Sequence, residues 1–148
     1  MPPTDVHARC RFLFLHCNDV AAMRAFYVGI LGMEEAAFQD TPQFGWLSVR
    51  AGAFEMMWFR SPVPLPVATE FADQPGWQGG TLLAPSWAIG VPEARFADVV
   101  RALVAAGTRL TSAEPEWRQD SYLAVSALDP MGAPVEVFTI PATRPPRD

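Results

Sequence analysis

The chain has 148 residues, of which half are apolar and only 18% are charged, with 16 acidic against 11 basic side chains and a net charge of −5. This composition predicts one folded domain, or two small modules that share a sheet, and excludes a disordered chain. The acidic balance offers nucleic acid no obvious basic surface. Residues 1–5 lack the charged and apolar regions of a secretion signal, and no apolar run approaches the roughly 20 residues of a membrane span. We therefore expect a cytoplasmic protein that binds neither nucleic acid nor membrane.

Residues 10–60 are predicted to form a module of one strand, one helix and three strands. Strands are expected at 10–17, 35–39, 45–50 and 54–60, from their runs of apolar and β-branched residues. Between the first two, Asn18-Asp19 offers a helix cap and Gly32 a stop. The apolar positions of this helix recur at helical spacing: Val20, Met23, Tyr27, Ile30 and Leu31.

The same order returns in residues 86–139. A strand at 86–91 precedes a helix that Pro92 opens and Gly107 ends, and weaker strands are expected at 108–110, 121–128 and 133–139. Aligning Cys17 with Val91 also aligns Phe26 with Val100, which indicates an internal repeat. The proline- and glycine-rich residues 61–85 are predicted to connect the modules, and 140–148 to form a tail.

The last predicted strand carries an acid inside an apolar run. It follows Asp129-Pro130-Met131-Gly132, the residues that a type I turn prefers. Val135 and Val137 alternate with Glu136, so the valines face one side of the sheet and the glutamate faces the other. A glutamate is costly there unless solvent, a cation or a ligand meets it, which makes that side a candidate binding cavity.

Other candidates share this side by their strand alternation. His16 has the parity of Phe12 and Phe14 and is either a polar strand end or a group for ligand contact and acid/base work. Trp46 and Ser48 lie opposite Leu47 and Val49, which are assigned to the helix layer. The remaining candidates are Trp58, near the same inner region, and Arg118 and Tyr122, which precede a strand; an arginine there would suit a carboxylate or phosphate.

Five motifs in order resemble the vicinal oxygen chelate superfamily, which includes glyoxalase I, extradiol dioxygenases and bleomycin resistance proteins. They are Phe26-Tyr27 with Leu31-Gly32, the turn at Ala51-Gly52, Ala106-Gly107, the turn at 129–132, and Glu136. The resemblance covers residues 10–139. It implies an α+β fold in which two paired βαβββ modules form a curved mixed sheet around a cavity, with helices on the outer face, and it implies a homodimer.

The resemblance also bears on metal binding. Metal-dependent members hold a cation with a residue of each module's first strand and a glutamate of each last strand. Glu136 matches one glutamate, and the other falls on Glu55 or Met56. The first-strand positions fall on Phe12 and Ser86, which are not ordinary ligands of divalent metals. The resemblance therefore implies no metal and no other cofactor, while Ser86 and Phe12 stay candidates for ligand contact.

Three functions are compatible with the sequence. The first is a metal-independent binder of a small organic molecule in an aromatic-lined cavity, similar to the bleomycin resistance proteins. The second is an enzyme of the glyoxalase, epimerase or dioxygenase type that uses Glu136, and His16, with an altered metal site. The third is a structural module whose cavity is filled by its own side chains. No nucleophile with a partner base and no nucleotide-binding fingerprint occurs.

Overall fold

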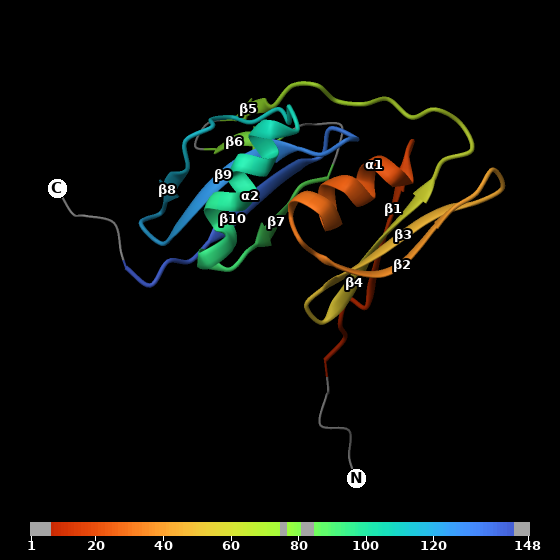
Figure 1. Ribbon diagram of the computed structural model, residues 1–148, viewed down its shortest axis with the longest axis horizontal. Helices are drawn as coiled ribbons and strands as arrows, with labels where there is room; N and C mark the ends of the chain where they lie inside the picture. Colours follow the sequence, from red (N-terminus) through yellow and green to blue (C-terminus); the bar gives the residue numbers. More distant parts are fainter. Residues whose placement is uncertain (1–6, 75–76, 81–84, 144–148) are drawn as a thin grey trace, which may run out of the picture. The chain divides into compact units, whose positions relative to one another are not determined.

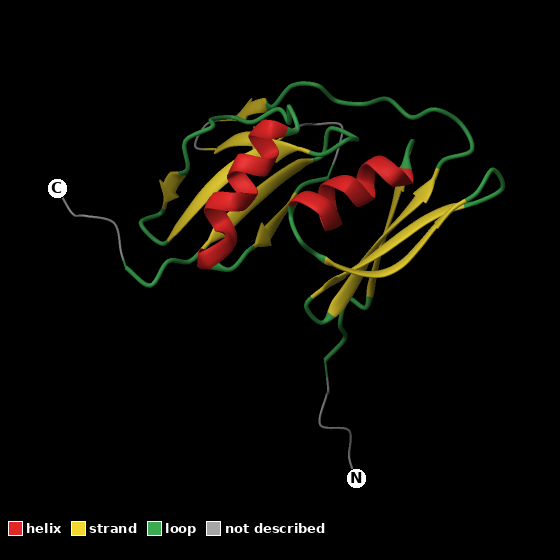
Figure 2. Ribbon diagram, viewed as in Figure 1, coloured by secondary structure: helices red, strands yellow, loops and turns green. Residues whose placement is uncertain are grey.

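The computed structural model describes residues 7–74, 77–80 and 85–143, and it divides the chain into two compact units, residues 1–64 and 65–148 (Figure 1). Parts of the predicted connector (75–76 and 81–84) and of the predicted tail (144–148) lie outside the described residues. Each unit combines a mixed sheet with one helical segment (Figure 2). The fold is therefore α+β, as predicted.

The first unit is a strand, a helical segment and three strands. Its strands are β1 (Phe12–Cys17), β2 (Glu34–Asp40), β3 (Gly45–Ala51) and β4 (Phe54–Arg60). They form a sheet in the order β1-β4-β3-β2, in which β1 runs parallel to β4 and the other pairs are antiparallel. The β3–β4 turn lies at Gly52 and Ala53, one residue later than predicted, because Ala51 pairs with Phe54. Gly52 has φ +69°, which only glycine adopts without strain.

The helical segment covers one face of this sheet. α1 (Val20–Arg24) begins at the predicted cap, where an oxygen of Asp19 accepts hydrogen bonds from the amides of Ala21 and Ala22. It continues as the π-helical turn η1 (Ala25–Ile30), in which the Leu31 amide bonds the Phe26 carbonyl at 3.0 Å. The core beneath consists of buried side chains from both layers: Val20, Met23, Phe26, Tyr27, Leu47, Val49, Met56 and Trp58.

The second unit repeats this topology. Its strands β7 (Trp87–Gly90), β8 (Glu116–Arg118), β9 (Tyr122–Leu128) and β10 (Pro134–Thr139) form a sheet in the order β7-β10-β9-β8. The position of β10 beside a parallel β7 matches that of β4 beside β1, so the predicted internal repeat is confirmed. A short antiparallel pair, β5 (Ala72–Gln74) and β6 (Trp77–Gly80), lies within the segment predicted as a connector. Neither four-stranded sheet closes into a barrel.

Helix α2 (Glu93–Ala105) packs on β10 and buries Phe96, Val99, Val100 and Leu103 (Figure 1). Pro92 is its cap residue and Gly107, at φ +71°, ends it. In the described parts of the chain, no helix combines the length and apolar character needed to cross a membrane.

The turn that leads into β10 has the predicted form. The Asp129 side chain accepts hydrogen bonds from the amides of Met131 (2.8 Å) and Ala133 (3.0 Å), and Gly132 has φ +80°. A Cβ on Gly132 would collide with the carbonyl oxygen of Ala68, so the 65–71 segment packs tightly against this turn.

One strand prediction in this unit is wrong. Residues 108–110 contribute only a bridge between Leu110 and Ala127, and the edge strand is β8, whose Trp117 and Arg118 pair with Leu123 and Tyr122. A turn at Gln119 and Asp120, both with positive φ, joins β8 to β9.

Candidate functional site

Glu136 lies on the face of the second sheet that α2 does not cover, as its strand alternation predicts. Val135 and Val137 are fully buried on the helix side, whereas Glu136 is half-buried. Its partners across the sheet are Ser126 on β9 and Ala88 on β7. Because side chains in register on neighbouring strands share a face, these three residues define the helix-free face of the second unit.

Arg118 forms an ion pair with Glu136. Its Nη1 lies 2.5 Å from Oε2 of Glu136, its Nη2 lies 3.1 Å from Oγ of Ser126, and both charged side chains are 22% exposed. β8 supplies the arginine and β9 the serine, so three strands converge on the acid. Charge-assisted hydrogen bonds between a guanidinium and a carboxylate are among the stronger hydrogen bonds in proteins. The carboxylate is therefore compensated within the unit.

Tyr122 completes this polar cluster, which consists of Arg118, Tyr122, Ser126 and Glu136. The Tyr122 hydroxyl donates a hydrogen bond to Glu136, and its ring meets that of Phe138 edge-on, with centroids 5.4 Å apart. The hydrogen bond to Glu136, burial and the negative charge of Glu136 raise the pKa of Tyr122, and the positive charge of Arg118 opposes the rise. At neutral pH the phenol is therefore a proton donor.

The helix-free face of the first sheet carries an aromatic cluster. Ring contacts join Phe12 to Phe14 (6.1 Å between centroids), Phe14 to Phe59 (6.0 Å) and Phe59 to Trp46 (6.4 Å, nearly parallel at 9°). Phe44 touches both Trp46 and Phe59. Phe12, Phe14 and Phe44 are 42%, 61% and 41% exposed, so this cluster presents apolar surface to its surroundings.

His16 and Ser48 share that face. His16 is exposed on β1 beside Phe59 of β4. Ser48 is buried, and its hydroxyl lies 2.8 Å from Oε2 of Glu55. Glu55, in register with Phe12, is thus the glutamate on the helix-free face, whereas Met56 lies in the core under α1.

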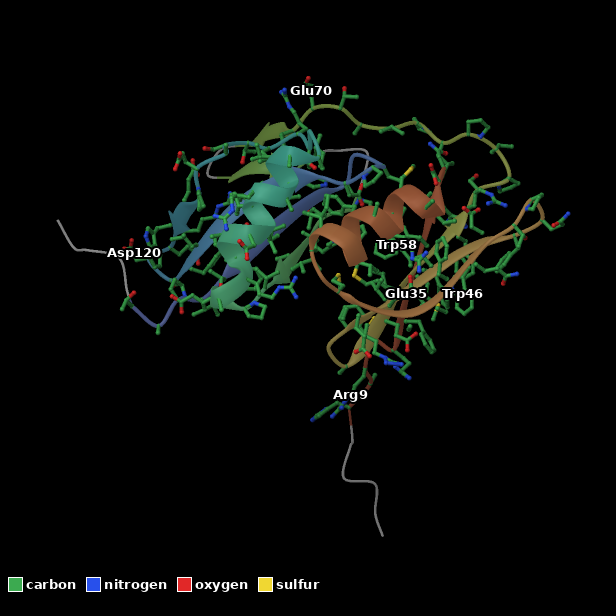
Figure 3. The ribbon with its side chains drawn as sticks, in the orientation of Figure 1. Arg9, Glu35, Trp46, Trp58, Glu70 and Asp120 are labelled. Carbon is green, nitrogen blue, oxygen red and sulfur yellow. The ribbon has the colours of Figure 1, made fainter. Side chains whose placement is uncertain are left out.

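Trp58 is not a wall of this face, contrary to the prediction. It is 1% exposed, and its ring stacks on Tyr27 of η1 with centroids 4.3 Å apart. Figure 3 labels Trp58 in the first unit. Leu47 and Leu15, its partners in the sheet, confirm that it points to the helix layer, because both have the parity opposite to Ser48 and Phe14. Trp58 is a core residue.

Ser86 does not stand directly beside Glu136. Ser86 is exposed and precedes β7, and the residue beside Glu136 on that strand is Ala88. In the first unit the equivalent partner of Glu55 is Phe12. Each glutamate therefore has an apolar neighbour where a metal site would need a ligand atom.

The side chains present do not suit a divalent metal. In residues 7–74, 77–80 and 85–143, no three His, Cys, Asp or Glu side chains gather closely enough to hold an ion. The guanidinium of Arg118 already contacts Glu136, and a cation there would meet a like charge.

Three site residues were missed by sequence reasoning. Ser126 has the same strand parity as Tyr122, and Phe59 the same parity as Glu55, so the two-residue period of a strand contained a signal for both. Phe44 lies outside a strand and had no such signal.

Comparison with known proteins finds solved structures with a similar fold. No protein-family model and no curated protein matches the sequence. A solved glyoxalase/dioxygenase from Nostoc punctiforme is similar in structure, with a TM-score of 0.66, 18% identity and coverage of 95% of this chain and 96% of that chain. The oxidase ChaP-H2 gives a TM-score of 0.63 at 18% identity over 90% and 94% of the two chains. Lactoylglutathione lyase from Agrobacterium tumefaciens gives 0.55 at 19% identity over 94% and 96%.

These neighbours share the repeated strand-helix-three-strand architecture expected from the five sequence motifs. At such identities the likeness concerns the fold alone. The chain therefore has the repeated βαβββ fold of these solved glyoxalase/dioxygenase structures.

Proposed function

We propose that this chain binds a small organic molecule on the helix-free faces of its sheets without a metal ion, in the manner of the bleomycin resistance proteins. The observation that carries the proposal is the ion pair between Arg118 and Glu136. Because of this pair, the counterion of Glu136 is a side chain of the protein and not an exchangeable metal ion.

The energetics of this pair favour metal independence. A divalent ion at Glu136 would have to displace the guanidinium from both the carboxylate and Ser126, which would leave the half-buried arginine without its acceptors. If the arginine stayed, two positive charges would lie within a few ångströms of each other. Either route opposes tight metal binding at this glutamate.

The aromatic cluster of the first sheet supports ligand binding. Its rings offer flat, polarisable surface for stacking, and exposed apolar patches of this kind mark interaction sites on soluble proteins. Small-molecule sites typically combine such surface with a few placed polar groups. On the same face of the first sheet, Ser48 with Glu55 supplies such groups.

The contact of Tyr122 with Glu136 favours an enzyme of the glyoxalase, epimerase or dioxygenase type as a second candidate. A carboxylate and a protonated phenol that share a hydrogen bond can accept and return a proton. His16 would then be a further acid/base group, since its imidazole is exposed. Loss of turnover in Glu136→Gln with retained ligand binding would select this candidate.

The test is a thermal-shift screen of aromatic diols, thioesters and glycopeptide antibiotics, each measured with and without a chelator, alongside divalent metals alone. A ligand that binds only the folded chain raises its Tm by mass action. We expect at least one organic compound to raise the Tm equally with and without chelator. Stabilisation that requires a divalent metal would overturn the proposal.

Assembly and location are parts of the same proposal. We propose a homodimer in the cytoplasm, and the exposed rings of the first sheet favour some association. Light scattering on the purified chain tests the dimer, and a monomeric mass at micromolar concentration would contradict it.

A further inference from the structure

Glu55 is an acid set among aromatic rings on the helix-free face of the first sheet. Its side chain is half-buried and faces the same side as Phe12, its register partner on β1. The hydroxyl of Ser48 bonds it at 2.8 Å. Among the ion pairs of the described residues, none involves Glu55.

The nearest basic partner in the sheet is already engaged. Arg50 stands opposite Glu55 on β3, but its Nη1 lies 3.1 Å from Oε1 of Glu34 on β2. Because Arg50 is paired with Glu34, Glu55 has no ion-pair partner on this row of the sheet among the described residues. Glu136, by contrast, has its own arginine. Of Glu55 and Glu136, the two glutamates considered for a metal site, Glu55 is therefore the one whose charge a cationic ligand could balance.

The ring beside Glu55 already accommodates a cation. The guanidinium carbon of Arg11 lies over Phe12, 4.9 Å from the ring centroid, within the range of a cation–π contact. Arg11 is exposed and joins Glu55 through its backbone, since its carbonyl accepts the Glu55 amide at 3.0 Å. A flat cation from the protein thus occupies surface that a ligand cation would use.

We infer that the ligand is an organic cation whose positive head group lies against Glu55 and Phe12 and whose flat body lies along Phe14 and Phe59. This inference rests on the proposed function and narrows its ligand class. The carboxylate supplies charge, and the ring faces supply the attraction that a weakly hydrated ammonium finds in aromatic sites. Phe14 and Phe59 continue the surface, with centroids 6.0 Å apart.

The test uses three water-soluble probes that share a benzyl group, titrated by NMR at millimolar concentration: benzyltrimethylammonium, neutral benzyl alcohol, and phenylacetate. The wild-type chain should bind the cation about tenfold more tightly than the neutral probe. Glu55→Gln keeps an acceptor for Ser48 and removes only the charge, so it should abolish most of that preference.

Arg11→Gln should change the affinity for the cationic probe in the opposite direction to Glu55→Gln. Removing the protein's own cation from Phe12 should strengthen binding of benzyltrimethylammonium about threefold. Arg101→Gln, on an exposed face of α2, is the matched control and should leave the affinity for all three probes unchanged.

Equal binding of the three probes, tighter binding of phenylacetate, or no binding of any of them would overturn this inference. The proposed function would stand in each case if the wider screen found a neutral or anionic compound that binds without metal. Preference for the cation that survives Glu55→Gln would also overturn the assigned role of Glu55.

Discussion

Nη1 of Arg118 lies 2.5 Å from Oε2 of Glu136, and the two side chains are equally enclosed, at 22% exposure each. The pair joins the edge strand β8 to the strand that carries the acid. It therefore has a structural effect, since it fixes the edge of the sheet, and a chemical one, since it neutralises the carboxylate.

Arg118→Gln should destabilise the fold by about 1–2 kcal/mol, because it leaves Glu136 half-buried without its cation. Urea unfolding gives the change in free energy of unfolding. Arg101→Gln breaks the exposed pair with Asp98 and should cost less than about 0.5 kcal/mol. Equal losses of unfolding free energy in the two variants would show that the Arg118–Glu136 pair stabilises the fold no more than an exposed ion pair does.

Tyr122 should ionise above pH 10, because its pKa is raised chiefly by the hydrogen bond to Glu136. A raised pKa means that the folded state favours the protonated phenol. The resulting stabilisation is complete below the unfolded pKa of about 10 and is lost as pH rises through the folded value. The difference in phenolate absorbance between wild type and Tyr122→Phe follows this group alone. In Glu136→Gln the same titration should move to lower pH, and an unmoved titration would contradict the assigned cause.

Gly132→Ala should cost about 3 kcal/mol or more, because the new Cβ meets the Ala68 carbonyl oxygen and φ is +80°. Gly52→Ala isolates the backbone effect: its φ is +69°, and no atom lies within 4 Å of the added Cβ. That variant should cost about 1 kcal/mol. Comparable losses at both positions would mean that the 65–71 segment does not pack on the turn as described.

Alanine variants of Trp58 and Phe14 should have different effects, the first on stability and the second on ligand binding. Trp58→Ala removes a buried ring that stacks on Tyr27 and should cost about 3–5 kcal/mol. Phe14→Ala removes a ring that is 61% exposed and should change stability by less than about 0.5 kcal/mol, while weakening any aromatic ligand. Urea unfolding and ligand titration of both variants decide this, and a large loss of stability in Phe14→Ala would place that ring in a core.

The sequence was sufficient for the repeat, for most strands and for the faces of Glu136 and Phe12, because strand alternation and turn glycines are local properties. It did not predict β8, since the residues before Gln119 form a strand only by pairing with β9. Trp58 was misplaced because its face depends on the register of the β3–β4 hairpin, which pairs it with Leu47. That register is set by the two-residue turn at Gly52 and Ala53.

The ion pair at Glu136 could be anticipated only in part. Arg118 and Tyr122 were candidates, but their convergence on Glu136 depends on the positive-φ turn at Gln119 and Asp120, which a sequence pattern does not favour. The residue directly beside Glu136 was not anticipated either, because the parallel register of β7 with β10 brings Ala88 there, and Ser86 stays a prediction for ligand contact.

The most direct test of the central claim is elemental analysis of the chain purified without chelator, before and after dialysis against micromolar Fe, Mn, Ni and Zn. With Arg118 as the permanent partner of Glu136, we predict far less than one bound metal ion per chain in both samples. One tightly held ion per chain, lost in Glu136→Gln, would contradict the account.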